Sequence, residues 1–434
     1  MTQVFKTTKS DISSYVLLPS FIAFGILFNN VFRWFPFPEG RSQNELSTID
    51  DNFVGILVNL AIYAILIILS LKVKFKNFTF SNSTIYTYCF LIFLQSFFRA
   101  DFDKEMIRSI SIICLMVSAT LIGSIFSSNE RRFEQILTTI FCSLAFSMII
   151  GLAIGFSKKG AVNFGAFGSD GFSNTVRAEF FFFFIQPYYL FSLSLFYFLN
   201  GSELKQKIFS ILCGLIIAVL SILTFTRTFI LGIFVSSSFV FLLWRKRLLL
   251  LSIFVTIVAI SVAAINIAAT EEFLLRYRII NSESSGDIST GRAELNQINI
   301  DTFTKNFPFG AGAQAAREEI DEKGGIAKTE HGYSIHLASY GVISLLFYAF
   351  VTLNLMKALL KLPHIFKMET KTRNVYLLCI SMITICFLSG FIGIFGSSTS
   401  FSDWLAVFFV NLAGNLVEKV HKGHNGYWRL NYGS

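Results

Sequence analysis

A chain of 434 residues in which 53% are hydrophobic and only 15% are charged lacks the composition of a soluble domain, where about a quarter of the residues are charged. Its 52 phenylalanines and long apolar runs are typical of a membrane protein. The net charge of +9 gives no reason to expect a nucleic-acid partner, because basic segments such as "WRKR" flank apolar runs and fit an anionic membrane surface.

Apolar stretches of membrane-spanning length recur along the whole chain, each close to the ~20 residues that a helix needs to cross the hydrocarbon core. They predict an all-α polytopic membrane protein with about 12 transmembrane helices and one large loop on the outer side that contains short helices. The expected spans are 15–32, 53–71, 83–98, 109–126, 136–156, 178–199, 208–225, 228–244, 248–269, 334–354, 375–395 and 401–417.

Charged residues are divided unevenly between the two sides of this predicted bundle. With both termini on one side, that side receives most of the 36 Lys and Arg, whereas the opposite side receives most of the 27 Asp and Glu. The positive-inside rule therefore predicts cytoplasmic termini. The expected organisation is transmembrane helices 1–9 in residues 1–269, the large outer loop in 270–333, helices 10–12 in 334–417 and a cytoplasmic tail in 418–434.

The loop 270–333 is much longer than the other connections, and such loops are usually structured or functional. Its segment "STGRAELNQINIDTFTKN" opens with cap-type residues and continues with helix formers, so we expect a short helix there. The following "FPFGAGAQ" places Pro308, Gly310 and Gly312 where they end that helix in a turn. The backbone amides of such a turn are able to face an anion, although glycine turns are common and this signal is weak.

Three arginines stand out as candidate ligands of an anionic group. The apolar run 208–244 is too long for one crossing and fits two short ones, which places Arg227 of "TFTRTFILG" at a hairpin tip on the outer surface. Arg177 ends a polar loop, and Arg292 opens the expected loop helix. Each has an alternative interpretation. Arg227 could simply reach to lipid headgroups, Arg177 could pair with Glu179, and Arg292 could be a solvated surface residue.

The segment "KTEHGYSIHLASYG" contains two histidines just before and within an expected span. His331 precedes the span by a few residues, which places a proton acceptor of near-neutral pKa at the membrane surface. His336 lies farther along, where a helix-packing role fits better.

Two pairs of carboxylates compete as metal ligands. Asp101 and Asp103 form a D-x-D on an outer loop, a pattern that holds a divalent cation and a sugar diphosphate in many glycosyltransferases, and Asp50 and Asp51 precede the second span. Such pairs also arise by chance in acidic loops, and we predict no metal site and no cofactor. The chain has no nucleotide-binding P-loop, no H-E-x-x-H and no G-x-S-x-G, which argues against an ATP-driven pump, a zinc protease and an α/β-hydrolase.

The order and spacing of "TFTRTFILG", "TGRAELNQINIDTFTKNFPFGAG" and "EHGYSIHLASYGVIS" resemble the O-antigen polymerase and ligase family, the Wzy and WaaL type of membrane glycosyltransferase of lipopolysaccharide biosynthesis. The resemblance covers roughly 215–350, and the N-terminal half matches only in hydropathy. It implies about a dozen helices in the bacterial inner membrane and an active site on the periplasmic side. It also implies metal-independent transfer of a glycan from undecaprenyl diphosphate.

Carried over by position, the resemblance implies that Arg227 and Arg292 bind the diphosphate, with Arg177 a weaker third. His331 is then the catalytic base. The family usually has asparagine after this histidine, whereas Gly332 follows here, so Tyr333 or His336 would have to supply what that asparagine contributes. Direct displacement at the anomeric carbon would invert its configuration, because retention needs a nucleophilic carboxylate.

Several functions stay open at this point. The first is a polymerase that extends lipid-linked repeat units of a surface polysaccharide, with lipid-linked glycans and membrane lipids as partners and a possible chain-length regulator. The ligase that transfers the finished glycan to lipid A core differs only in the acceptor, and the absent His-Asn pair favours the polymerase. A transporter or flippase is the alternative from another class, but the expected spans carry few interior charges and no internal repeat. A structural scaffold fits the long polar loop least well.

Overall fold

The structure, a computed structural model, describes residues 9–30, 53–71, 80–98, 102–127, 130–159, 164–166, 176–178, 187–201, 203–223, 232–238, 292–322, 332–365, 370–392 and 401–421. These residues are almost all helical. The membrane-type helices are α1 (Lys9–Asn30), α3 (Phe53–Leu71), α4 (Phe80–Phe97), α5 (Phe102–Phe126), α6 (Glu130–Lys159), α7 (Pro187–Asn200), α8 (Leu204–Leu223), α15 (Ser344–Leu360), α17 (Thr370–Ile392) and α18 (Phe401–His421).

The remaining elements are short. They are the helices α12 (Arg292–Lys305), α13 (Ala313–Glu322), α14 (Gly332–Tyr340) and α16 (Leu362–Ile365), the 3-10 turn η3 (Gly341–Ile343), and the strands β1 (Phe164–Ala166) and β2 (Val176–Ala178). The two strands pair antiparallel, with Gly165 opposite Arg177. The helical fold class is thus confirmed, and the sequence pattern did not indicate the strand pair.

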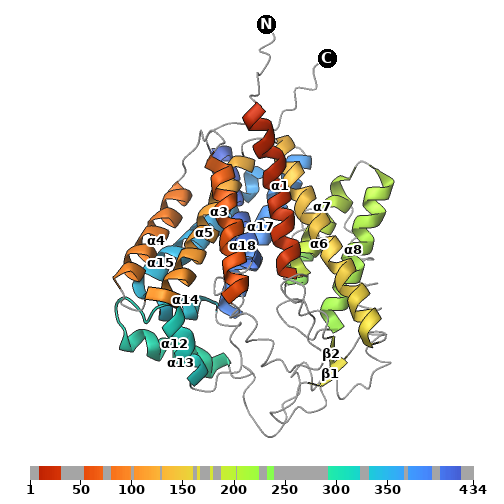
Figure 1. The fold of residues 1–434 in the computed structure, drawn as a ribbon. Helices are drawn as coiled ribbons and strands as arrows, with labels where there is room; N and C mark the ends of the chain where they lie inside the picture. The colour runs from red at the N-terminus through yellow and green to blue at the C-terminus, as the bar shows by residue number, and fades with distance from the viewer. Residues whose placement is uncertain are drawn as a thin grey trace.

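The long helices lie side by side in one bundle around α18 (Figure 1). Helix α18 packs against α5, α17 and α15, and most of its side chains are buried by these neighbours. Its polar side chains find partners inside the bundle: the indole nitrogen of Trp404 donates to Ser118 Oγ at 2.9 Å, and Asn411 Nδ2 donates to the Thr120 carbonyl at 2.7 Å. Such interhelical hydrogen bonds matter in lipid, where no water is present to replace them.

Four helical segments among the described residues have the length and apolar composition to cross a membrane: Val54–Leu71, Met106–Phe126, Arg132–Ala153 and Tyr333–Leu360. Two shorter apolar helices are Val16–Asn30 and Arg373–Leu388. The chain is therefore an integral membrane protein by these features, and the expected total of about 12 spans stays a prediction.

Several expected spans coincide with helices of the structure. The span 53–71 has the bounds of α3, and 401–417 lies within α18. The span 178–199 includes α7, and its residues 179–186 lie outside the described residues. The span 334–354 falls on two helices, α14 and α15, which η3 separates. The span 248–269 lies outside the described residues.

Helices α12, α13 and α14 gather at one end of the bundle, which we name the loop end (Figure 1). Helix α1 runs toward the loop end, so its C-terminal end lies there (Figure 1). Helix α18 begins on the same side, because its first residue Phe401 lies against Gly25 near the C-terminal end of α1. The same region holds a buried amide pair in which Asn29 and Asn59 exchange hydrogen bonds of 2.8 and 3.1 Å. The start of α1 and the end of α18 therefore lie at the opposite end of the bundle, as a common side for both termini requires.

Candidate functional site

Helix α12 confirms the short helix expected in the large loop, and it packs on α14. A serine and two asparagines join the two helices. Ser334 Oγ accepts a hydrogen bond from Asn299 Nδ2 at 2.9 Å and donates one to Asn296 Oδ1 at 2.8 Å. Asn299 is 1% exposed, whereas Asn296 is exposed, so this contact, which we name the seam, runs from the buried to the open side of α12.

The seam fixes which ends of the two helices meet. Asn296 lies about one turn after Arg292, the first residue of α12, and Ser334 lies two residues after Gly332, the first residue of α14. The N-terminal ends of α12 and α14 therefore lie on the same side of the seam. Arg292 begins one of them, and His331, which is outside the described residues, directly precedes the other in the chain.

The turn after α12 closes onto the junction between α14 and η3. The amides of Ala311 and Gly312 donate to the carbonyls of Ala338 and Ser339 at 2.6 and 2.9 Å, and the Val342 amide donates to the Pro308 carbonyl at 2.9 Å. Backbone groups that the end of α14 leaves unsatisfied are thus paired by the turn.

This pairing corrects one expectation from the sequence. The three amides of the "GAG" segment pair with carbonyl groups instead of facing an anion: the Gly310 amide donates to the Asn306 carbonyl at 2.9 Å, and the next two amides donate to carbonyls of α14. The glycines serve the backbone conformation instead, with φ of 72° at Gly310 and 106° at Gly312.

Helix α14 lies across the loop end of the bundle. Near its N-terminal end, the Tyr333 hydroxyl donates to the Phe387 carbonyl of α17 at 3.4 Å, and the Tyr348 hydroxyl of α15 donates to the Tyr333 carbonyl. Near its C-terminal end, the Ser339 carbonyl accepts from Gln95 of α4 at 3.4 Å. The N-terminal end of α14 is consequently held between α15 and α17, and the hydrogen bonds of Ser334 join α12 to it.

His336 is a packing residue of this arrangement. It is 2% exposed, its Nδ1 lies 3.0 Å from the Tyr88 hydroxyl, and its ring lies 5.0 Å from that of Phe347. Tyr333 is half-buried, with its ring edge-to-face with Tyr348 at 4.7 Å. Both residues secure α14 to the membrane helices, and neither lies on an open surface.

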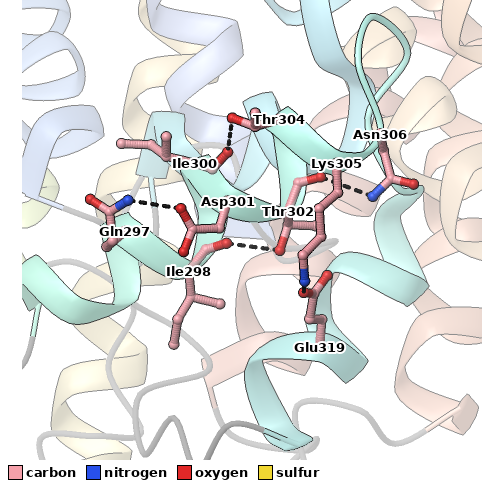
Figure 2. A network of polar contacts seen from close by, with 9 residues as sticks. All are labelled: Gln297, Ile298, Ile300, Asp301, Thr302, Thr304, Lys305, Asn306 and Glu319. Atoms are coloured by element: carbon pink, nitrogen blue, oxygen red, sulfur yellow. Dashed lines mark hydrogen bonds and ion pairs between the residues drawn. The ribbon is translucent and has the colours of Figure 1, made fainter.

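The face of α12 away from α14 is polar (Figure 2). Gln297 donates to Asp301 at 2.8 Å within the helix, and Lys305 pairs with Glu319 of α13 at 3.0 Å. The Lys305 side chain is 62% exposed. An ion pair this exposed contributes little to stability, but it marks the side of α12 and α13 that water covers.

The other predicted site residues are only partly placed. Arg227, like His331, is outside the described residues, so the structure leaves its convergence with Arg292 as a prediction. Arg177 lies on β2, and Figure 1 shows β1 and β2 toward the same end of the bundle as α12 but on its other side, beside α8. The structure therefore does not bring the Arg177 strand next to α12.

The carboxylates weighed as metal ligands lie mostly outside the described residues. Asp103 lies in the first turn of α5, whereas Asp50, Asp51 and Asp101 are outside the described residues. Within the described ranges, no three His, Cys, Asp or Glu side chains are grouped as a metal site would require.

Two buried charged residues went unnoticed in the sequence. Arg108 is 5% exposed near the start of α5, the membrane helix on which α13 packs, and Asp403 is 2% exposed in the first turn of α18. The signal was available, because an ionisable residue at the edge of an apolar helix marks a functional or positioning role.

The geometry thus combines a membrane bundle with a short helical unit at its loop end, in which hydrogen bonds of Ser334 join α12 to the N-terminal end of α14. Residues 212–357 match the family model described as O-antigen ligase. The resemblance to the O-antigen polymerase and ligase family is confirmed. No curated protein sequence matches the chain.

The match covers the elements of the site described above. It begins within α8, includes α12, α13 and α14, and ends near the end of α15. The family implies a membrane glycosyltransferase-type enzyme that acts on lipid-linked glycans.

Proposed function

We propose that this protein is a polymerase of a bacterial surface polysaccharide, which transfers a growing glycan from undecaprenyl diphosphate to a lipid-linked repeat unit at the periplasmic face of the inner membrane. The observation that carries the proposal is the seam between Ser334 and the two asparagines, because it holds the N-terminal ends of α12 and α14 together within the family-matched region. These are the ends that carry Arg292 and lead back to His331.

The roles follow from the charges of the reaction. As the bond between the anomeric carbon and the diphosphate oxygen breaks, negative charge grows on the diphosphate, and guanidinium groups stabilise such charge through paired hydrogen bonds. Arg292 and Arg227 take this role in the proposal. Arg177 is retained as a third ligand only if its strand approaches the site in the bound state.

His331 acts as the base. The hydroxyl oxygen of the acceptor sugar forms the new bond to the anomeric carbon, its proton passes to the His331 imidazole, and the polyprenyl diphosphate leaves with the bonding electrons. General-base catalysis of this kind is worth roughly 10²–10⁴-fold in rate. One displacement inverts the configuration at the anomeric carbon, and no step calls for a metal.

The ligase is the second candidate, and the family match does not distinguish it from the polymerase. It would use the same donor, arginines and base with lipid A core as the acceptor. The polymerase comes first in the proposal because Gly332 stands where the family usually has asparagine after the histidine.

The test is deletion of the gene in its host, followed by gel analysis of the surface polysaccharide with plasmids for the unchanged protein, His331→Ala and Arg292→Ala. A polymerase leaves single repeat units capped on the lipid core and removes the long ladder, which neither variant restores. Loss of every capped species, with polymer left on its carrier, identifies the ligase. An unchanged ladder would contradict both enzyme hypotheses, and the transporter would then be the hypothesis to test.

A further inference from the structure

Exposed phenylalanines from two distant segments meet at the loop end. Phe93, Phe97 and Phe98 at the end of α4 are 42%, 55% and 80% exposed, and Phe307 and Phe309 of the turn after α12 are 67% and 58% exposed. We name these five residues the aromatic patch. Gln95 Nε2 donates to the Phe309 carbonyl, which fixes the turn beside the end of α4.

The patch continues onto a candidate membrane span. The Val342 amide donates to the carbonyl of Pro308, the residue between the two phenylalanines of the turn. Val342 and Leu345, at the start of the α15 segment, are themselves 38% and 54% exposed. One apolar surface therefore runs from the turn onto helices whose outward faces need an apolar solvent.

The length of α15 gives the depth of this surface. Together, η3 with 3 residues and α15 with 17 cover the chain from Gly341 to Leu360, which is the ~20 residues that the hydrocarbon core requires. Lys357 and Lys361 mark the far end of this segment, where basic residues favour the headgroups. Gly341 then lies at the near boundary of the hydrocarbon, and this is the point at which the turn docks.

The polar face of α12 and α13 supports the same orientation. Its exposed ion pair between Lys305 and Glu319 belongs in water, whereas the phenylalanines that follow Lys305 by two and four residues do not. A helical unit with a charged face and an aromatic edge is suited to the interface between water and acyl chains.

We propose that the aromatic patch inserts into the adjacent lipid leaflet and thereby seats the α12 and α13 unit on the membrane surface. The occupant is the acyl region of the bilayer itself, and the proposal holds independently of the reaction that the site performs. The seat sets the height of the paired N-terminal ends of α12 and α14 relative to the lipid headgroups.

The experiment measures the accessibility of spin labels in the full-length protein, reconstituted in vesicles of phosphatidylethanolamine and phosphatidylglycerol. The background carries C114S and C142S, because the other four cysteines are buried. Labels are placed by F307C and F309C in the turn and by F97C on α4. The lipid reference is F90C, whose phenylalanine is 60% exposed on α4 about two turns before Phe97, and the water reference is K305C, whose lysine side chain is 62% exposed.

We expect the labels at positions 307, 309 and 97 to be more accessible to oxygen than to a water-soluble nickel complex. The ratio of the two accessibilities should equal the ratio found at position 90. A nickel accessibility at 307 and 309 equal to that at 305 overturns the proposal, because the turn then faces water. Low accessibility to both reagents with spin–spin broadening also overturns it, because a second copy then covers the patch. Each labelled protein must elute like the unlabelled one in size-exclusion chromatography, and position 97 reads the patch without altering the turn.

Discussion

Gly310 and Gly341 pack backbone against backbone. A Cβ atom on Gly310 would stand 2.6 Å from the Gly341 amide nitrogen, and one on Gly341 would stand 2.7 Å from the Gly310 amide nitrogen. The two residues also adopt φ of 72° and 56°, in the left-handed region. The junction between the loop helices and the membrane helices therefore accepts only glycine at both positions.

We expect Gly341→Ala and Gly310→Ala each to lower the free energy of unfolding by about 2–4 kcal/mol, since a left-handed alanine is strained and the opposing backbone has to move. Titration with sodium dodecyl sulfate, followed by circular dichroism, measures the change. Gly151→Ala is the matched control, because nothing lies within 4 Å of a Cβ there. Equal stability of the Gly341 and Gly151 variants would show that the turn does not dock as described.

We expect the loss of the Ser334 hydroxyl to destabilise the protein less than the glycine substitutions do. Ser334→Ala removes the hydrogen bonds to Asn296 and Asn299, which we expect to cost about 1–2 kcal/mol and to lower glycan transfer by loosening the ends of α12 and α14. Ser334→Thr keeps a hydroxyl and should restore most of the activity.

The control for this seam is Thr304→Ala. The Thr304 hydroxyl donates to the Ile300 carbonyl of its own helix at 2.8 Å, and this hydrogen bond is exposed. Transfer of radiolabelled glycan by the purified variants measures the comparison. A loss of activity in Thr304→Ala as large as that in Ser334→Ala would argue against a special role of the seam.

Hydropathy predicted the membrane helices because a helix in lipid forms its backbone hydrogen bonds within itself. Each long apolar run can therefore be recognised without knowing its neighbours. The loop helix at Arg292 was predictable from its caps and helix formers, and the break at Gly310 from the glycines. These features depend on local sequence alone.

The relationships that build the site were not readable in this way. The use of the Ala311 and Gly312 amides by α14, and the position of His336 against Tyr88, join residues far apart in the chain. Only tertiary packing decides between an amide that faces an anion and one that pairs with a carbonyl. The strand pair that contains Arg177 is made of only two three-residue segments, too short for a readable alternating pattern.

The proposed role of Arg292 predicts that lysine does not replace it. A guanidinium presents two parallel donors to a phosphate, whereas an ammonium acts as a point charge. We expect Arg292→Lys and Arg292→Ala to lower kcat/KM for the lipid-linked donor, with lysine recovering only a minor part of the loss.

The control for charge is Lys305→Ala on the same helix, where the exposed pair with Glu319 contributes little. It should retain activity at low and at moderate salt. Full activity of Arg292→Lys would reject paired donation by this residue, and equal loss in Lys305→Ala would mean that the general positive charge of α12 is what matters.

The two histidines of the α14 region are expected to respond in opposite ways to one substitution. His336→Phe keeps an aromatic ring against Phe347 and loses the contact with the Tyr88 hydroxyl, so we expect a cost of about 1 kcal/mol and nearly unchanged transfer. His331→Phe removes the proposed base, so the transfer rate should fall by roughly 10²–10⁴-fold without a comparable change in unfolding free energy. The rate with purified donor and acceptor, set beside the detergent titration, separates the two effects. If His336→Phe abolished transfer while the protein stayed folded, the base would have to be sought within the buried cluster of His336 and Tyr88, and the proposed role of His331 would be wrong.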